Sequence, residues 1–334
     1  MKVLVTGGAG FIGSNFVRHL LSSNGDAEVV VIDRLTYAGR RDNLDGLPED
    51  RLEFVEADIC DRAAVANSLK GCSALVNFAA ESHVDRSVDS PEDFIRTDVT
   101  GTFVLLEACR DAGIRMVQIS TDEVYGSIDE GTFTEQSHLD PSSPYSASKA
   151  SGDLLVSAFH KTYGLEALIV RASNNYGTRQ HPEKLIPLTI LNALHGDPIP
   201  IYGDGKQVRN WLFVEDFCRA IETVLKTGLA GEVYNVGGPD EVENIEVVER
   251  ILDLTGADRD LISFVADRPG HDVRYSLSSG KTEALGWKAE VSFSEGLERT
   301  VEWYRENRAW WEPVRSGEYR EWYLKQYGVS LTED

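Results

Sequence analysis

Short apolar runs alternate with amphipathic stretches along the first half of the chain. The runs are rich in Val, Ile and Leu and contain few polar residues, as expected of strands buried on both faces of a parallel sheet. Between them, apolar residues recur at helical spacing, as in 103–112 and 146–163. The pattern therefore predicts an α/β fold with a doubly wound parallel sheet. The predicted strands are Val3–Val5, Val29–Ile32, Leu52–Val55, Ala74–Phe78, Met116–Ile119 and Ala167–Val170.

The alternation becomes less regular after about residue 174. Proline and glycine cluster in 197–205, and a helix (214–225) and a strand (233–236) are predicted beyond them. The last part of the chain is rich in Trp and Tyr. We therefore expect two domains, a sheet domain over residues 1–173 and a smaller C-terminal lobe over 174–334. Some segments of that lobe are expected to return to the main domain.

Composition excludes several classes of protein. A net charge of −22 argues against a nucleic-acid partner, because phosphate binding requires basic patches. No apolar run approaches the ~20 residues of a membrane span, and the first residues lead directly into a predicted strand. The four cysteines and seven histidines show no metal-ligand spacing. We expect a cytoplasmic protein with reduced cysteines, no metal and no membrane partner. Its acidic, arginine-rich surface is typical both of high-salt cytoplasm and of ordinary acidic enzymes.

Glycines punctuate the turn between the first predicted strand and the first helix. Gly8-Ala9-Gly10-Phe11-Ile12-Gly13 fits G-x-G-x-x-G, and Asp33 follows about 20 residues later. Such glycines let the backbone approach a pyrophosphate at a helix N-terminus, and the carboxylate binds ribose hydroxyls and disfavours a 2′-phosphate. The pattern predicts a Rossmann site for NAD. The residues predicted to bind it are Gly7, Gly10, Phe11, Ile12, Gly13, Asp33, Asp58, Ile59, Ala80, Tyr145 and Lys149.

Redox chemistry is indicated by Tyr145 and Lys149, which share one helical face at i and i+4. A lysine cation beside a phenol lowers its pKa, so Tyr145 is predicted to accept a proton from a substrate hydroxyl. Thr121 follows a predicted strand and is expected to hydrogen-bond the same oxygen. Each feature alone is more often structural, but together with the glycine turn they favour catalysis.

Two carboxyl groups, Asp122 and Glu123, directly follow Thr121. Solvated loop charges are the ordinary explanation for such a pair. Beside a redox site they suggest more, because oxidising the C4 alcohol of a sugar acidifies the C5 proton. Elimination of water across C5 and C6 then requires one acid and one base.

These residues resemble those of the dTDP-glucose 4,6-dehydratase family, within the extended short-chain dehydrogenase/reductase superfamily. The resemblance covers nearly the whole chain and is far more specific than the glycine motif. It departs from the family pattern at Arg40-Arg41, at Thr178-Arg179 and at Asp98, where asparagine is common. The stretches that carry it include 35–39, 80–87, 120–126, 173–177, 182–187 and 267–272.

The resemblance implies roles for the catalytic residues. Asp122 would protonate the departing C6 hydroxyl, Glu123 would remove the C5 proton, and Tyr145 would act at the C4 hydroxyl. The hydride would return to C6, so NAD would be regenerated in every turnover. It also implies a homodimer and a nucleotide-sugar substrate. The residues implied to bind that substrate are Ser82, Thr121, Asn174, Lys184, Leu185, Arg209, Asn244, Arg268 and His271.

Two other functions remain in competition. A UDP-sugar 4-epimerase or decarboxylase on the same scaffold would not need the acid–base pair Asp122 and Glu123 for elimination. A non-catalytic NAD-binding sensor would not need Tyr145 and Lys149, and the chain has both. The sequence therefore favours a nucleotide-sugar 4,6-dehydratase.

Overall fold

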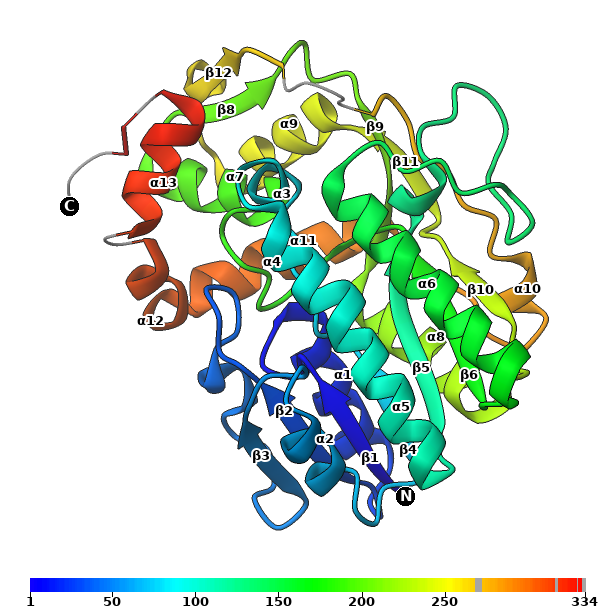
Figure 1. Ribbon diagram of the computed structural model, residues 1–334. Coiled ribbons are helices and arrows are strands. Elements are labelled where there is room, and N and C mark those ends of the chain that lie inside the picture. Colours follow the sequence, from blue (N-terminus) through cyan, green and yellow to red (C-terminus); the bar gives the residue numbers. More distant parts are fainter. Residues whose placement is uncertain (268–271, 316–317, 329, 332–334) are drawn as a thin grey trace.

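The computed structural model describes residues 1–267, 272–315, 318–328 and 330–331. Its centre is a seven-stranded sheet in the order β10-β6-β5-β4-β1-β2-β3 (Figure 1). Every pair of neighbouring strands in this sheet is parallel. The six strands predicted in the first half are all present, and the strand predicted at 233–236 completes the sheet. The strands are β1 Lys2–Thr6, β2 Glu28–Asp33, β3 Leu52–Glu56, β4 Ala74–Asn77, β5 Arg115–Thr121, β6 Ala167–Ala172 and β10 Val233–Val236.

Both faces of β1, β2, β4 and β6 are buried, which explains the apolar runs in these strands, whereas the edge strand β3 is partly exposed. In β1, Val3 and Val5 pack into one core cluster and Leu4 into another on the opposite face. Helices α1 and α8 cover the first face, and α2, α5 and α6 cover the second. These helices are α1 Phe11–Ser23, α2 Arg62–Ser68, α5 Thr102–Ala112, α6 Pro144–Tyr163 and α8 Val214–Thr227.

The C-terminal lobe has its own core and two small sheets. Helices α7, α9 and α11 pack around this core, which is rich in aromatic residues. The three-stranded sheet contains β7 Asn174–Tyr176, β9 Val208–Phe213 and β11 Asp240–Glu243, and the two-stranded sheet contains β8 Ile199–Tyr202 and β12 Ile262–Val265. The helices are α7 Leu185–His195, α9 Asn244–Thr255, α11 Phe293–Glu306, α12 Arg308–Trp311 and α13 Glu318–Tyr327.

Short helical segments complete the described chain. Three of them, α3, α4 and η2, lie between β4 and α5, and η2 is a π-helical turn. Another, η3, directly follows β5. The short segments are η1 Arg41–Leu44, α3 Val84–Asp89, α4 Pro91–Phe94, η2 Ile95–Gly101, η3 Asp122–Tyr125, η4 Arg259–Leu261, α10 Gly280–Glu283 and η5 Glu312–Arg315.

The main sheet and the three-stranded sheet meet where the chain leaves β10. Gly238 donates from its backbone to the side chains of Ser173 and Asn210. A Cβ at this position would overlap the carbonyl oxygen of Trp211 in β9. The close approach of these two backbone segments therefore requires a glycine.

Gly238→Ala tests this junction. We expect the substitution to lower the free energy of unfolding by about 3 kcal/mol or more, because backbone rather than a flexible side chain must move. Urea denaturation measures the effect. Gly25→Ala is the matched control, since its Cβ would meet nothing within 4 Å, and it should change stability by less than about 0.5 kcal/mol. Equal stability of the two variants would contradict the proposed junction.

Candidate active site

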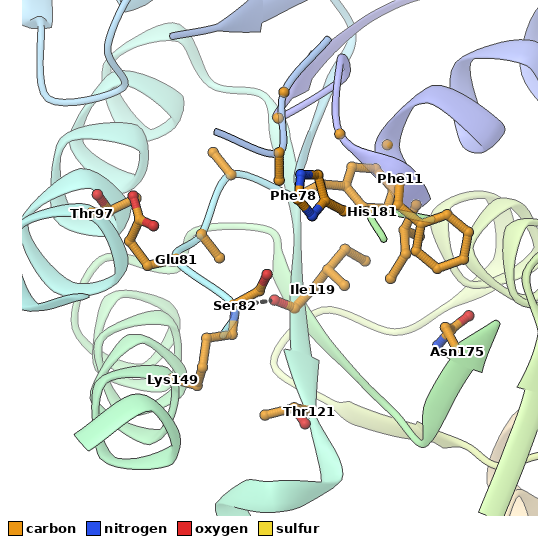
Figure 2. Close-up of a pocket in the computed structure, with 18 of the residues that line it drawn as sticks. Phe11, Phe78, Glu81, Ser82, Thr97, Ile119, Thr121, Lys149, Asn175 and His181 are labelled. Carbon is orange, nitrogen blue, oxygen red and sulfur yellow. Dashed lines mark hydrogen bonds between the residues drawn. The ribbon is translucent and has the colours of Figure 1, made fainter. Parts of the chain in front are cut away.

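A cavity of about 310 Å³ opens at the carboxyl edge of the main sheet. Its lining includes residues at or just after the ends of β1, β2, β4, β5 and β6 (Figure 2). Strand β1 lies between β2 and β4, so the chain order reverses there. A crevice at such a reversal is where open α/β sheets bind their ligands.

The glycine turn forms one wall of this cavity. Gly7 has a positive φ of 66°, which a residue with a side chain rarely adopts. A Cβ on Gly13 would overlap the carbonyl oxygen of Gly7. Helix α1 begins after Gly10 without a side-chain cap, so its first N–H groups are available to an anion. The turn therefore fits a pyrophosphate.

Asp33 at the end of β2 holds this turn in place. One carboxylate oxygen accepts from the Ala9 N–H at 2.9 Å and the other accepts from the Leu35 N–H at 2.8 Å. Burial raises the pKa of Asp33, while these hydrogen bonds and Arg34 oppose the rise. Each oxygen keeps a second lone pair, so the carboxylate can still accept from ribose hydroxyls. Asp58, the next acidic residue in the lining, pairs with Arg34 at 3.0 Å.

The two adjacent carboxyl groups lie on η3, immediately after β5. The Thr121 hydroxyl accepts from the Glu123 N–H and donates to an oxygen of Asp122 at 3.2 Å. Asp122 is only 2% exposed, and its second oxygen has no hydrogen-bond partner among the described residues. Burial, and then the neighbouring Glu123, raise the pKa of Asp122 to about 8. At neutral pH this carboxyl group therefore holds a proton.

Tyr145 and Lys149 reach the cavity from the first turns of α6. The helix begins with a capping box between Ser143 and Ser146, which fixes its start beside Tyr145. Lys149 donates to the carbonyl oxygen of Ile119 in β5 at 2.8 Å (Figure 2). Burial first, and then Glu123, raise the pKa of Tyr145 well above its ordinary value, although a hydrogen bond with Thr121 opposes this.

Burial and the neighbouring carboxyl groups therefore oppose ionisation of the Tyr145 phenol. Lys149 is predicted from the sequence to lower the pKa of Tyr145, whereas burial and the carboxyl groups of Glu123 and Asp98 raise it. The physical reason is that desolvation disfavours any charge in this cavity, and the net charge near the phenol is negative.

A further carboxyl group, Asp98, lies behind the Tyr145–Lys149 pair. It belongs to η2 and is 3% exposed. One oxygen accepts from the Ser148 hydroxyl at 2.6 Å, and the other accepts from the Glu81 N–H at 3.2 Å. Burial raises the pKa of Asp98 to about 6, and Lys149 opposes the rise. From the sequence, Asp98 was noted only because asparagine is common at this position in relatives, and no role was predicted for it.

A buried polar network supports η3 from behind. Asp153 on α6 accepts from Ser120 at 3.0 Å and forms an ion pair with Arg171 at 2.8 Å. Arg171 in turn donates to the Tyr125 hydroxyl at 2.8 Å. Ser120 and Tyr125 flank the segment that carries Asp122 and Glu123, so this network fixes both of its ends.

Most predicted site residues line this cavity. All the predicted catalytic and cofactor-binding residues do so, as do Ser82, Asn174 and Lys184 from the predicted substrate set. Leu185, Arg209 and Asn244 lie outside that lining. Arg209 is held by the carbonyl oxygens of Asp272 and Val273 and stacks over Tyr275. Arg268 and His271 lie outside the described residues.

Sequence reasoning missed three ionisable side chains in the lining, Glu81, His181 and Glu183. Burial raises the pKa of Glu81. Burial lowers the pKa of His181 to about 3, and the positive charge of Arg86 also lowers it. The Glu183 carboxylate is 1% exposed and pairs with Arg86 at 3.3 Å. Glu81 and Glu183 lie in stretches that carried the resemblance, which was the only signal pointing to them.

Two searches of the described residues gave negative results. No group of three or more His, Cys, Asp or Glu side chains is arranged to hold a metal ion there. Among the described helices, none combines the length and apolar character needed to cross a membrane.

Comparisons with known proteins identify the family. A model described as GDP-mannose 4,6 dehydratase matches residues 4–300. The chain belongs to this family. It is 51% identical to the dTDP-glucose 4,6-dehydratase of Streptomyces niveus, over 95% of this chain and 96% of that protein. It is also 55% identical to the low-salt glycan biosynthesis protein Agl12 of Haloferax volcanii, over 91% of this chain and 98% of that protein.

Solved structures of the family share the fold described above. DesIV, the dTDP-glucose 4,6-dehydratase of Streptomyces venezuelae, was crystallised with NAD and TYD bound. It superposes with a TM-score of 0.91 at 55% identity, covering 94% of this chain and 100% of that one. The Thermus thermophilus UDP-glucose 4-epimerase in complex with NAD gives a TM-score of 0.85 at 33% identity, covering 92% and 100%. The chain is thus more similar to these dehydratases than to this epimerase.

The buried carboxyl group of Asp122 makes stability depend on pH. The folded protein retains this proton up to about pH 8, whereas the unfolded chain releases it near 3.8. Ionisation therefore opposes folding increasingly as the pH rises between these values. We expect Asp122→Asn to be more stable than the natural protein at pH 8.5, by at least about 1 kcal/mol.

Urea denaturation at several pH values checks this expectation. The advantage of Asp122→Asn should shrink toward pH 5, where both proteins carry an uncharged side chain at this position. Asp129→Asn removes one exposed carboxyl group nearby and controls for the change in net charge. An advantage that does not vary with pH would show that Asp122 is not the titrating group.

Proposed function

We propose that this chain is an NAD-dependent dTDP-glucose 4,6-dehydratase. The observation that carries the proposal is the placement of Asp122 and Glu123 in one cavity with Tyr145, Lys149 and a dinucleotide turn. Oxidation and reduction alone would require only Tyr145, Lys149 and the dinucleotide turn. A proton donor and a proton acceptor beside them suit the elimination of water. The curated and solved dehydratases of about 50% identity support the same activity.

The reaction begins at the sugar C4 hydroxyl. Thr121 orients this hydroxyl, and Tyr145 removes its proton. NAD, which the glycine turn and Asp33 would hold, would supply the hydride chemistry at C4 and C6. Burial raises the pKa of the free Tyr145 phenol. The positive charge of Lys149 on the same helical face favours loss of the phenol proton.

The elimination follows from the acidity of the C5 proton beside the new ketone. Glu123 removes that proton, and Asp122 protonates the departing C6 hydroxyl. The burial that raises the pKa of Asp122 to about 8 supports its role as the acid. Glu123 is only partly buried, which suits a carboxylate that acts as the base. Glu123 returns its proton to C5 when C6 is reduced, and the proton taken by Tyr145 balances the one given by Asp122. The product is dTDP-4-keto-6-deoxyglucose, and one water is released.

We assign substrate binding to the mouth of this cavity. Ser82 and Thr121 face the sugar, and Lys184, held by the Ser82 carbonyl oxygen at 2.8 Å, lies beside them. Lys184, Arg209 and Arg268 are suited to the diphosphate, because cations favour phosphate in an otherwise acidic protein. The remaining proposed substrate contacts are Asn174, Leu185, Asn244 and His271.

We also propose a cytoplasmic homodimer with the domain division 1–173 and 174–334. Helices α5 and α6 lie side by side, and α6 exposes large apolar side chains such as Leu154 and Tyr163, which are 61% and 55% exposed. An exposed apolar face of this kind suits a second copy of the chain. The four free cysteines suit a reducing compartment.

The proposed function is tested by incubating the protein with dTDP-glucose and, separately, UDP-glucose. We expect dTDP-glucose to lose one water, which mass spectrometry would measure. NMR should show that the product is a 4-keto sugar. Conversion of UDP-glucose to UDP-galactose would instead indicate an epimerase. A protein that binds NAD but changes neither substrate would support the non-catalytic sensor and overturn the dehydratase.

Glu123→Gln separates oxidation from elimination. We expect C4 oxidation to continue, so that reduced cofactor accumulates on the protein. Exchange of the C5 proton with deuterated solvent should fall by about 100-fold, because general base catalysis is lost. Asp122→Asn is the matched control, since it should retain C5 exchange while water loss slows. Wild-type C5 exchange in Glu123→Gln would assign the base to another residue.

A further inference from the structure

A cluster of tryptophans and arginines joins the C-terminal helices to the dinucleotide turn. Trp303 on α11 and Trp310 on α12 meet edge to face, with their ring centroids 5.0 Å apart. Arg40 lies over the Trp310 ring at 4.9 Å, and Arg179 lies over the Trp303 ring at 5.4 Å. These two arginines are among the departures from the family pattern. In Figure 1, α12 lies close to the loop that follows β2.

Trp310 reaches the glycine turn through one buried side chain, Asn43. The Trp310 indole N–H donates to the Asn43 side-chain oxygen at 2.8 Å. The Asn43 side-chain N–H donates in turn to the carbonyl oxygen of Ala9, also at 2.8 Å. Asn43 is 1% exposed, so neither of its side-chain groups can exchange this partner for water.

Ala9 is thereby fixed on both sides of its backbone. Its N–H donates to Asp33, and its carbonyl oxygen accepts from both Asn43 and the Arg40 N–H. Ala9 stands between Gly8 and Gly10, at the centre of the turn that fits the pyrophosphate. Because glycines leave this backbone intrinsically flexible, its geometry depends on these hydrogen bonds.

The second arm of the cluster reaches the start of α1. Asn15 donates to the carbonyl oxygens of both Phe11 and Thr178, at 2.9 and 3.0 Å. Thr178 precedes Arg179, whose positive φ of 66° directs the chain toward Trp303. The tryptophan pair is therefore connected to the glycine turn through Asn43 and to the start of α1 through the segment of Thr178 and Arg179.

We propose that Trp310, acting through Asn43, is a positioning residue that slows dissociation of the bound dinucleotide. The inference rests on the proposed function, in which NADH formed in the first step must remain bound until its hydride returns. Preorganising the turn lowers the cost of binding and so raises the barrier to release. A dehydratase with a loose turn would lose NADH before completing a turnover.

Trp310→Phe tests the role of the indole N–H while keeping an aromatic ring beneath Arg40. It leaves the buried Asn43 oxygen without its donor. We expect bound NADH to dissociate about 10-fold faster, measured by stopped-flow fluorescence with excess NAD as the competitor and no nucleotide-sugar present. Trp303→Phe is the matched control, because it makes the same truncation on the neighbouring tryptophan, keeps a ring beneath Arg179 and leaves the bond between Trp310 and Asn43 intact. In Trp303→Phe the rate of NADH dissociation should stay within about twofold of that in the natural protein.

Asn43→Asp provides a second test that does not alter the aromatic cluster. It keeps an acceptor for Trp310 but removes the donor to Ala9, so NADH should again dissociate faster. During turnover of dTDP-glucose, both variants should release free NADH into solution. Dissociation at the natural rate in both variants would overturn the inference while leaving the dehydratase intact. Failure of the natural protein to turn over any nucleotide-sugar would overturn the proposed function. The NADH dissociation rates of the variants and the natural protein could still be measured and compared in that case.

Discussion

The site depends on two carboxyl groups sharing one low-dielectric cavity. Asp122 and Glu123 are neighbours in the chain, and burial together with mutual repulsion makes ionising both of them costly. Their environments differ, because Asp122 is nearly inaccessible and Glu123 is only partly buried. This difference gives a protonated and an ionisable carboxyl group side by side, as an elimination requires. Much of the surrounding structure holds this unfavourable arrangement in place.

The supporting structure is itself built from buried charge. The ion pair between Asp153 and Arg171 is almost fully desolvated, and such pairs are weak contributors to stability unless further hydrogen bonds complete them. Here Ser120 and Tyr125 add two bonds that connect the pair to both ends of η3, but the second oxygen of Asp153 has no hydrogen-bond partner among the described residues. The network is therefore better explained by the position it imposes on η3 than by its contribution to stability.

The main sheet was predictable because burial on both faces leaves a simple signal. Each strand is an apolar run, and its carboxyl end is where polar residues such as Asp33 and Thr121 appear. The three-stranded sheet was not predicted, because β9 mixes charged and aromatic residues without a regular period. Its strands also pair across long sequence separations, which local patterns do not encode. Short strands that take their partners from distant segments are set by tertiary packing.

The same distinction applies within the site. The glycine turn and the Tyr145–Lys149 pair were predicted because their function requires a fixed local spacing. The pKa of Tyr145 also depends on burial and on Asp98 and Glu123, which local spacing does not report. Asn43 gave no signal at all, although it joins two halves of the molecule. Its neighbours Ala9 and Trp310 are hundreds of residues apart in sequence, yet both depend on one amide that water does not reach. A site that must retain its cofactor through two hydride transfers is thus completed by contacts visible only in the folded chain.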